Sequence, residues 1–158
     1  MRLPAVDPTV LPARTSSGYP SPFRERVLPR EKRALGDAAG LTKIGINLTT
    51  LPPGKESSMR HHHSHEDEFV YVLEGEITLV TNEGEQVLRA GMCAGFPCGK
   101  DDAHQLINRS DKPVRYLEVG NRDTDDFVEY PDVDMALHRD AAGKFVFTHK
   151  DGSPYKEE

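Results

Sequence analysis

The chain has 158 residues with a formal net charge of −6, which suits one compact domain with a modest core. Its negative charge argues against a nucleic-acid-binding surface, and no apolar run approaches the roughly 18 residues that a membrane-spanning helix needs. The N-terminal sequence also lacks the apolar stretch of a signal peptide. We therefore expect a cytoplasmic protein that binds neither nucleic acid nor membranes.

Residues 1–38 are rich in Pro, Ser and Arg, and they predict an extended N-terminal arm without a core of its own. Its basic stretch, FRERVLPREKR, shows no apolar helical stripe. We expect this arm to lie on an acidic surface, either of its own domain or of a partner subunit. Residues 39–158 are then expected to form a single domain.

The first predicted strand begins after residue 41, where Ile44, Ile46 and Leu48 alternate with less apolar residues before Pro52 and Pro53. Further short strands follow, bounded by turn residues, and no helical pattern of ten residues separates them. The expected strands are residues 59–63, 69–73, 76–81, 85–89, 104–108 and 114–120. Short, evenly spaced strands of this kind predict an all-β antiparallel sandwich or barrel.

Beyond Gly120 the pattern changes. Residues 121–134 are strongly acidic and are expected to form a loop over the surface. Residues 135–139 and 144–149 then predict a closing C-terminal hairpin.

Four of the seven histidines lie within residues 61–65, inside the chain rather than at a terminus. Alternate side chains of a strand point to one face, so His61 and His63 project together while His62 faces away. Glu68 begins the next strand, and antiparallel pairing can bring its carboxylate beside both imidazoles. His104, which opens a later strand after a glycine-rich segment, is the candidate fourth ligand.

The same residues carry a resemblance. The pattern HxHx4Ex6G, read as His61, His63, Glu68 and Gly75, resembles the first motif of the cupin superfamily. The stretch GMCAGFPCGKDDAHQLIN, residues 91–108, resembles the second. The resemblance covers about residues 41–120 and implies a short single-domain cupin, whose fold is a double-stranded β-helix or jelly-roll barrel. It also implies one divalent metal ion near the barrel mouth, held by His61, His63, Glu68 and His104.

Three histidines and a carboxylate suit Zn, Fe, Mn or Ni, and the sequence does not distinguish these metals. The alternative is a metal-free barrel with a partly solvated histidine cluster. His62 has the wrong phase and His65 lies in the bend, so both are placed outside the ligand set.

The expected substrate cavity is mostly apolar. Val70, Val72 and Leu106 share the inward phase of the ligand strands. Cys98 could contact substrate or act as a soft ligand, although we expect Cys93 and Cys98 to be reduced structural thiols. Four polar residues lie on strands whose inward-facing positions the sequence does not determine, and they are expected to be exposed or structural: Lys43, Asn47, Tyr116 and Glu118.

Three functions remain open from the sequence, because cupin chemistry is diverse. The leading one is a metal-dependent enzyme with dioxygenase-like or related oxidative chemistry on a small organic molecule. The second is sugar-phosphate isomerisation, for which Lys100 and Arg60 are the only cations identified near the site. The third is a binding or sensor module without turnover.

An apolar outer face is predicted for the strand at residues 69–73, with Phe69, Tyr71 and Leu73 pointing away from the core. Such a face is costly in water. We therefore expect a homodimer, in which the arm reaches toward the neighbour. The alternative is that the chain's own tail covers these side chains.

Overall fold

The computed structural model describes residues 4–156 of the chain. Helical segments are short and confined to the N-terminal part: η1 (Pro8–Val10), α1 (Ser21–Val27) and α2 (Leu35–Ala38). The strands are β1 (Glu31–Ala34), β2 (Ile44–Leu51), β3 (His62–His63), β4 (Glu68–Glu74), β5 (Glu76–Thr81), β6 (Gly84–Arg89), β7 (Cys93–Phe96), β8 (Gln105–Ile107), β9 (Val114–Asn121), β10 (Val128–Tyr130), β11 (Met135–Arg139) and β12 (Phe145–Thr148).

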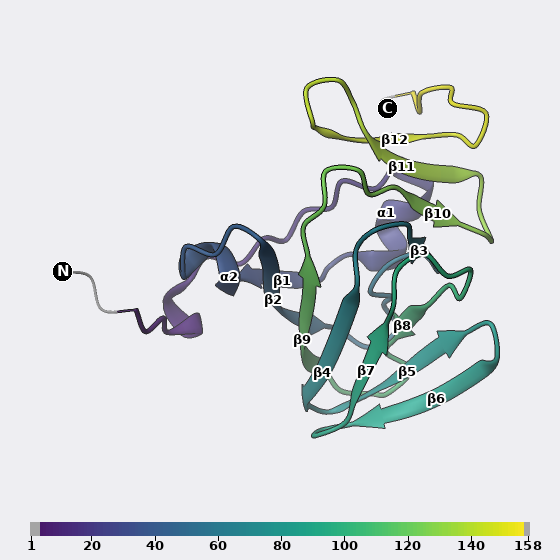
Figure 1. Ribbon diagram of the computed structural model, residues 1–158. Helices are drawn as coiled ribbons and strands as arrows, with labels where there is room; N and C mark the ends of the chain where they lie inside the picture. Colours follow the sequence, from purple (N-terminus) through teal and green to yellow (C-terminus); the bar gives the residue numbers. More distant parts are fainter. Residues whose placement is uncertain (1–3, 157–158) are drawn as a thin grey trace.

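Two antiparallel sheets form the barrel (Figure 1). One has the strand order β1-β2-β9-β4-β7 and the other the order β6-β5-β8. Between them lies a core of aliphatic side chains with one tyrosine: Leu51, Val70, Val72, Ile77, Leu79, Leu88, Leu106, Val114 and Tyr116. The predicted all-β fold, a double-stranded β-helix or jelly-roll barrel, is confirmed.

Strand β4 shows how the sequence sets this geometry. Val70 and Val72 are buried, and Glu68 shares their inward face. The intervening Phe69 and Tyr71 are 39% and 37% exposed. Gly75 ends the strand with φ +83°, a conformation that side chains rarely adopt, and a Cβ there would lie 3.0 Å from Pro113 O. The turn therefore fixes which face of β4 points inward.

Two segments differ from the predicted strands. Residues 59–63 form only the short strand β3, with His61 in a separate bridge to His104. The glycine-rich stretch after residue 91 contains β7, which pairs with the N-terminal half of β4, residues 68–71. Its Cys-Ala-Gly-Phe sequence lacks apolar alternation, so its strand conformation depends on this pairing.

The acidic segment 121–134 is not only a surface loop, contrary to expectation. Val128–Tyr130 form β10, which pairs with β3 on one side and with β11 on the other. Val128 and Tyr130 are buried, because the pairing turns both toward the barrel and the N-terminal segment. The predicted C-terminal hairpin is present as β11 and β12.

The N-terminal arm runs beside the barrel and contributes to it. β1 pairs antiparallel with β2, which places Lys32 opposite Thr49 and adds a strand to the sheet edge. The prediction that the arm's basic residues lie on an acidic surface is wrong for Arg30, which is 6% exposed, and for Lys32, which points into the barrel. Strand pairing sets the direction of Lys32, since alternate residues of β1 face the interior, and Arg30 precedes this strand by one residue.

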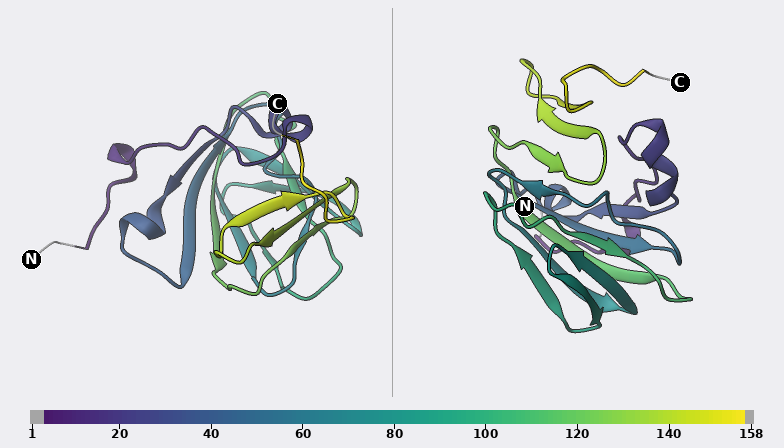
Figure 2. Two further views of the ribbon diagram at one scale, coloured as in Figure 1. Left: turned by 90° about the horizontal axis from the view of Figure 1, so that it is seen from above. Right: turned by 90° about the vertical axis from the view of Figure 1, so that its right-hand side faces the viewer.

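A second core joins this arm to the C-terminal hairpin. It contains Tyr19, Val27, Met59, Val128, Tyr130 and Met135. Figure 2 shows α1 on the same side of the molecule as β11 and β12. The arm and the hairpin thus close one end of the barrel together. None of the helices within residues 4–156 is long and apolar enough to cross a membrane.

Candidate metal centre

The predicted ligands come from three neighbouring segments at this closed end. His61 and His104 face each other through two backbone hydrogen bonds, His61 N–H to His104 O at 3.0 Å and His104 N–H to His61 O at 2.8 Å. His63 lies two residues along the same segment, and Glu68 opens β4. Extended chain therefore turns all four side chains to one point.

The imidazoles converge on the carboxylate of Glu68. His104 Nε2 lies 2.7 Å and His61 Nε2 lies 3.2 Å from Glu68 Oε2, and His63 Nε2 lies 3.3 Å from Glu68 Oε1. The structure thus brings together the four side chains singled out in the sequence. Donor atoms of His61, Glu68 and His104 all lie within 4.8 Å of one another.

Electrostatics at this centre are dominated by the histidine–carboxylate contacts. Burial alone would raise the pKa of Glu68, but His61, His104 and His63 outweigh it and hold that pKa well below its usual value. Burial would lower the pKa of His63, but Asp126 and Glu68 reverse the shift and raise it to about 10. The pKa of His104 is lowered by burial, which Glu68 opposes only in part. The carboxylate is therefore ionised at neutral pH.

The outer nitrogens of two rings are held in place by acceptors. His61 Nδ1 lies 2.9 Å from Met59 O and 3.2 Å from Ser58 Oγ. His63 Nδ1 lies 2.7 Å from Asp126 Oδ2. A carbonyl or carboxylate oxygen requires a proton on the facing Nδ1, so each Nε2 presents a lone pair to the centre when the ring is neutral.

This donor set fits a divalent metal. With Nδ1 of His61 and of His63 already donating outward, hydrogen bonds from their Nε2 atoms to Glu68 would require two adjacent imidazolium rings. A cation bound by the Nε2 atoms and the carboxylate lets both rings remain neutral. His61, His63, Glu68 and His104 are thus the residues that would hold it.

Asp126 was missed by sequence reasoning, since it lies in the acidic stretch that was expected to form a surface loop. Its side chain is fully buried. Besides His63, it accepts hydrogen bonds from the backbone N–H of His65 at 2.8 Å and of Glu66 at 3.2 Å. Nothing in the local sequence distinguishes it from Asp123 or Asp125.

His62 and His65 lie outside the candidate ligand set, as expected from the phase of His62 and from the position of His65 in the bend. His62 turns to the opposite face, where its Nε2 lies 3.2 Å from Glu129. His65 is exposed, with its Nδ1 2.7 Å from Ser64 Oγ.

A cavity of about 380 Å³ opens beside the centre. Four cationic side chains and three carboxylates line it: Arg30, Lys32, Arg122, Arg139, Glu66, Glu68 and Glu118. The expectation of a mostly apolar cavity is therefore wrong, because the N-terminal arm and the hairpin add polar walls to the barrel. Val70 and Leu106 line the cavity as expected, whereas Val72 and Cys98 are not among the described residues that line it.

Cys98 lies outside the cavity wall, and its backbone N–H donates to Asp67 at 2.9 Å. Val72 belongs to the apolar core deeper in the barrel. Arg60 and Lys100, the two cations identified near the site from the sequence, are not among the described residues that line the cavity either. Arg60 is bonded to Asp132 at 2.7 Å and 2.9 Å on the outside, and Lys100 is exposed.

A Lys–Glu pair lies on the cavity wall. Lys32 Nζ lies 2.7 Å from Glu118 Oε2. Glu118 pairs across the sheet with Val70, and Glu68 pairs with Gly120, so the two glutamates are diagonal neighbours on the inner face. Such neighbours lie about 7–8 Å apart. Asn47, opposite Glu118 on β2, also lines the cavity. Asn47 and Glu118, whose inward or outward direction the sequence left open, therefore both face the cavity.

Comparison with known proteins agrees with this architecture. A family model described as a cupin domain matches residues 47–120. A structure from Silicibacter pomeroyi, described as a sugar phosphate isomerase from a cupin superfamily, is 43% identical with a TM-score of 0.91 and covers 97% of each chain.

A second structure, from Acidithiobacillus ferrooxidans, is provisionally described as a sugar phosphate isomerase. It is 35% identical with a TM-score of 0.71, covering 82% of this chain and 81% of the other. A polyketide cyclase from Streptomyces resistomycificus is 20% identical with a TM-score of 0.63, covering 76% and 80%, so it shows the fold alone. No curated protein matches the chain closely enough to count as a relative.

Proposed function

Because the chain belongs to the cupin superfamily, we propose that it isomerises a phosphorylated sugar between its aldose and ketose forms at a divalent metal. The metal would be held by His61, His63, Glu68 and His104. The two most similar structures described above carry sugar phosphate isomerase in their descriptions, which supports the substrate class. The cavity volume of about 380 Å³ suits a small molecule.

The observation that carries this proposal is the Lys32–Glu118 pair beside the metal centre. Isomerisation moves a proton between adjacent carbons and needs a base that takes the proton and returns it. Glu118 is half-buried, lines the cavity and lies on the same inner face as Glu68. Its carboxylate would remove the proton from the carbon next to the carbonyl and deliver it to the former carbonyl carbon. The hydroxyl proton of the first carbon would move to the former carbonyl oxygen, so that one C=O bond is lost and one is formed with no net oxidation.

A bound divalent cation would supply Lewis-acid polarisation of the carbonyl oxygen. Lys32 contacts Glu118 at 2.7 Å and would place a positive charge near the developing enediolate. Side chains of the arm and of the hairpin, among them Arg30 and Arg139, form part of the cavity wall beside this pair.

The experiment is a deuterium-exchange assay. The purified protein is incubated in D2O with five- and six-carbon sugar phosphates, and NMR follows both interconversion and deuterium at the carbon next to the carbonyl. Glu118→Gln should bind metal normally but lose the exchange by about 10²–10⁴-fold. His104→Ala should lose metal and exchange together.

Absence of exchange with every sugar phosphate, in protein shown to hold metal, would contradict the proposal. Oxidative chemistry, the leading expectation from sequence, stays a prediction; oxygen consumption with diketones, thiols and phenols tests it. Tight ligand binding without product in either assay would favour the sensor alternative.

A further inference from the structure

A buried cationic side chain in the cavity has no counter-charge. Arg30 is 6% exposed and lines the cavity, and none of the ion pairs found within residues 4–156 includes it. Its Nε is buried without a hydrogen-bond partner among the described residues. Two contacts hold the guanidinium in place, a hydrogen bond from Nη1 to Ser57 O and a position 5.9 Å from the centre of the Tyr19 ring.

Burying a charge in this way is unfavourable unless an opposite charge compensates it. Two other cavity cations show the usual solution, since Lys32 is paired with Glu118 and Arg122 with Asp37. Within residues 4–156, Arg139 also lacks a carboxylate and its Nε is likewise buried without a partner, but its side chain is only half-buried, donates to Gly143 O at 3.0 Å and stacks on Phe145 at 4.0 Å. Arg30 is therefore the residue whose environment lacks an anion most clearly.

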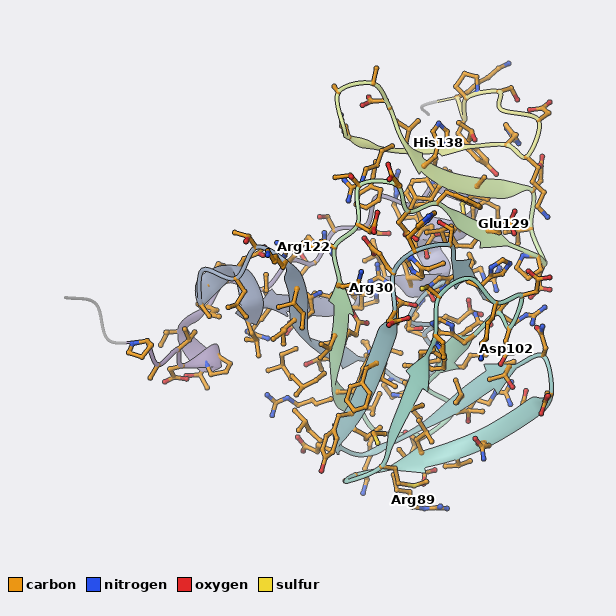
Figure 3. The ribbon with its side chains drawn as sticks, viewed as in Figure 1. Arg30, Arg89, Asp102, Arg122, Glu129 and His138 are labelled. Carbon is orange, nitrogen blue, oxygen red and sulfur yellow. The ribbon has the colours of Figure 1, made fainter. Side chains whose placement is uncertain are left out.

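The position of Arg30 is tied to the metal centre. Ser57 accepts the hydrogen bond from Arg30, and the adjacent Ser58 contacts His61 Nδ1 at 3.2 Å. A chain of rings gives a second link, since Tyr19 lies 6.2 Å from Tyr130 and Tyr130 lies 5.8 Å from His61. Figure 3 shows Arg30 near the middle of the molecule, whereas Arg122 lies toward α2. The guanidinium is thus held at a set distance from the candidate ligands.

We propose that Arg30 is the anchor for the phosphoryl group of the substrate. This inference rests on the proposed function for its substrate class. A guanidinium matches the geometry of phosphate oxygens and forms charge-assisted hydrogen bonds to them. The phosphoryl dianion supplies the charge that Arg30 lacks, while the uncharged part of the sugar extends toward Glu118 and the metal.

The test measures the binding of inorganic phosphate by calorimetry and by its effect on the Tm. Arg30→Met is compared with the wild type and with Arg122→Met, which removes a cavity cation that already has a partner. Arg30→Met should weaken phosphate binding by about 10-fold or more, since hydrogen bonds to charged groups are involved. Arg122→Met should change it less than about 3-fold.

The Tm of the variants distinguishes a phosphate anchor from a residue that only supports the fold. Because Arg30→Met removes an uncompensated buried charge, its Tm without phosphate should equal or exceed that of the wild type, and phosphate should no longer raise it. A lower Tm with an unchanged phosphate effect would show that Arg30 only supports the fold and would overturn the proposal. Arg30→Lys, which keeps the charge, covers the case in which Arg30→Met fails to fold; it should retain part of the affinity.

A further variant tests whether phosphate binds at the histidines instead. If His104→Ala weakens phosphate binding and Arg30→Met does not, the anion binds at the metal centre and the anchor proposal is wrong. If only Arg139→Met weakens it, the anchor lies on the hairpin and the proposal is also wrong. Phosphate binding that depends on Arg30, together with no sugar-phosphate exchange, would leave the anchor standing and contradict only the proposed reaction.

Discussion

Asp126 Oδ2 lies 2.7 Å from His63 Nδ1, and the aspartate side chain is completely buried. This contact fixes the orientation of the His63 ring and leaves Nε2 facing Glu68. Burial would raise the pKa of Asp126, but His63 and the backbone N–H groups of His65 and Glu66 outweigh it and lower that pKa. Asp126 is therefore a charged partner of a candidate ligand at neutral pH.

We expect Asp126→Asn to lower metal affinity by about 10–100-fold, the usual effect of removing such a carboxylate. Competition with a fluorescent chelator measures the affinity. Glu129→Gln is the matched control, since Glu129 makes the same kind of contact to His62 outside the site. Equal affinities for wild type and Asp126→Asn would mean that His63 needs no orienting partner.

The four candidate ligands were predictable because each lies on a strand whose alternation sets its direction. His61 and His63 are two residues apart, and Glu68 has the phase of Val70 and Val72 in β4. His104 opens a later strand, and the resemblance to two cupin motifs includes the same four residues. The barrel itself followed from short strands bounded by turn residues, and Gly75 marks one of these turns with its positive φ.

The polar part of the cavity was not predictable in the same way. Arg30 and Lys32 lie in a Pro- and Arg-rich stretch without periodicity. Lys32 faces inward because β1 pairs with β2, and Arg30 directly precedes that strand. Asp126 is buried because β10 pairs with β3. These contacts join segments far apart in the sequence, and no local pattern of charge encodes them.

The Lys32–Glu118 pair predicts a pH dependence. Burial lowers the pKa of Lys32, and Glu118 opposes this shift only in part. The protonated form supports the reaction, so kcat/KM should fall as pH rises through a value below the usual lysine pKa of about 10.4. Lys32→Arg keeps its charge over this range.

The measurement is a pH–rate profile with the best sugar phosphate substrate. Lys32→Arg should have a lower plateau but no decline at high pH. A decline at the same pH in both proteins would assign it to another group.

Gly120 predicts a local effect on stability. It pairs with Glu68 across the sheet, and a Cβ at this position would lie 3.0 Å from Asp67 O and 3.9 Å from Glu68 Cγ. Because backbone must move to make room, Gly120→Ala should lower the free energy of unfolding by about 1–3 kcal/mol. Urea denaturation measures the change.

Gly95 offers the matched control, because it lies in β7 and a Cβ there would meet nothing within 4 Å. Gly95→Ala should be neutral or slightly stabilising. If both substitutions leave stability unchanged, the close approach of Gly120 to Asp67 is not a constraint.

The outer face of β4 bears on assembly. Phe69, Tyr71 and Leu73 are 39%, 37% and 44% exposed, so the chain's own tail, as far as residue 156, does not cover them. The homodimer expected from sequence stays a prediction, but the arm cannot simply be removed to test it. Arg30 and Lys32 line the cavity and β1 completes the sheet, so a chain lacking residues 1–38 would lose part of its own barrel.

A double substitution on the exposed face is the sharper experiment. Phe69→Glu with Tyr71→Glu places two negative charges on this face of each copy. Because like charges brought together at an interface cost about 1 kcal/mol or more each, the dimer dissociation constant should rise by about 10-fold or more. Sedimentation velocity should show a dimer for the wild type and a monomer for the double variant. Val87→Glu, on the exposed side of β6, is the control because Val87 is also 41% exposed and lies in the other sheet. A dimer that survives the double substitution, or a wild type that is monomeric at every concentration tested, would show that this face is not the contact between subunits.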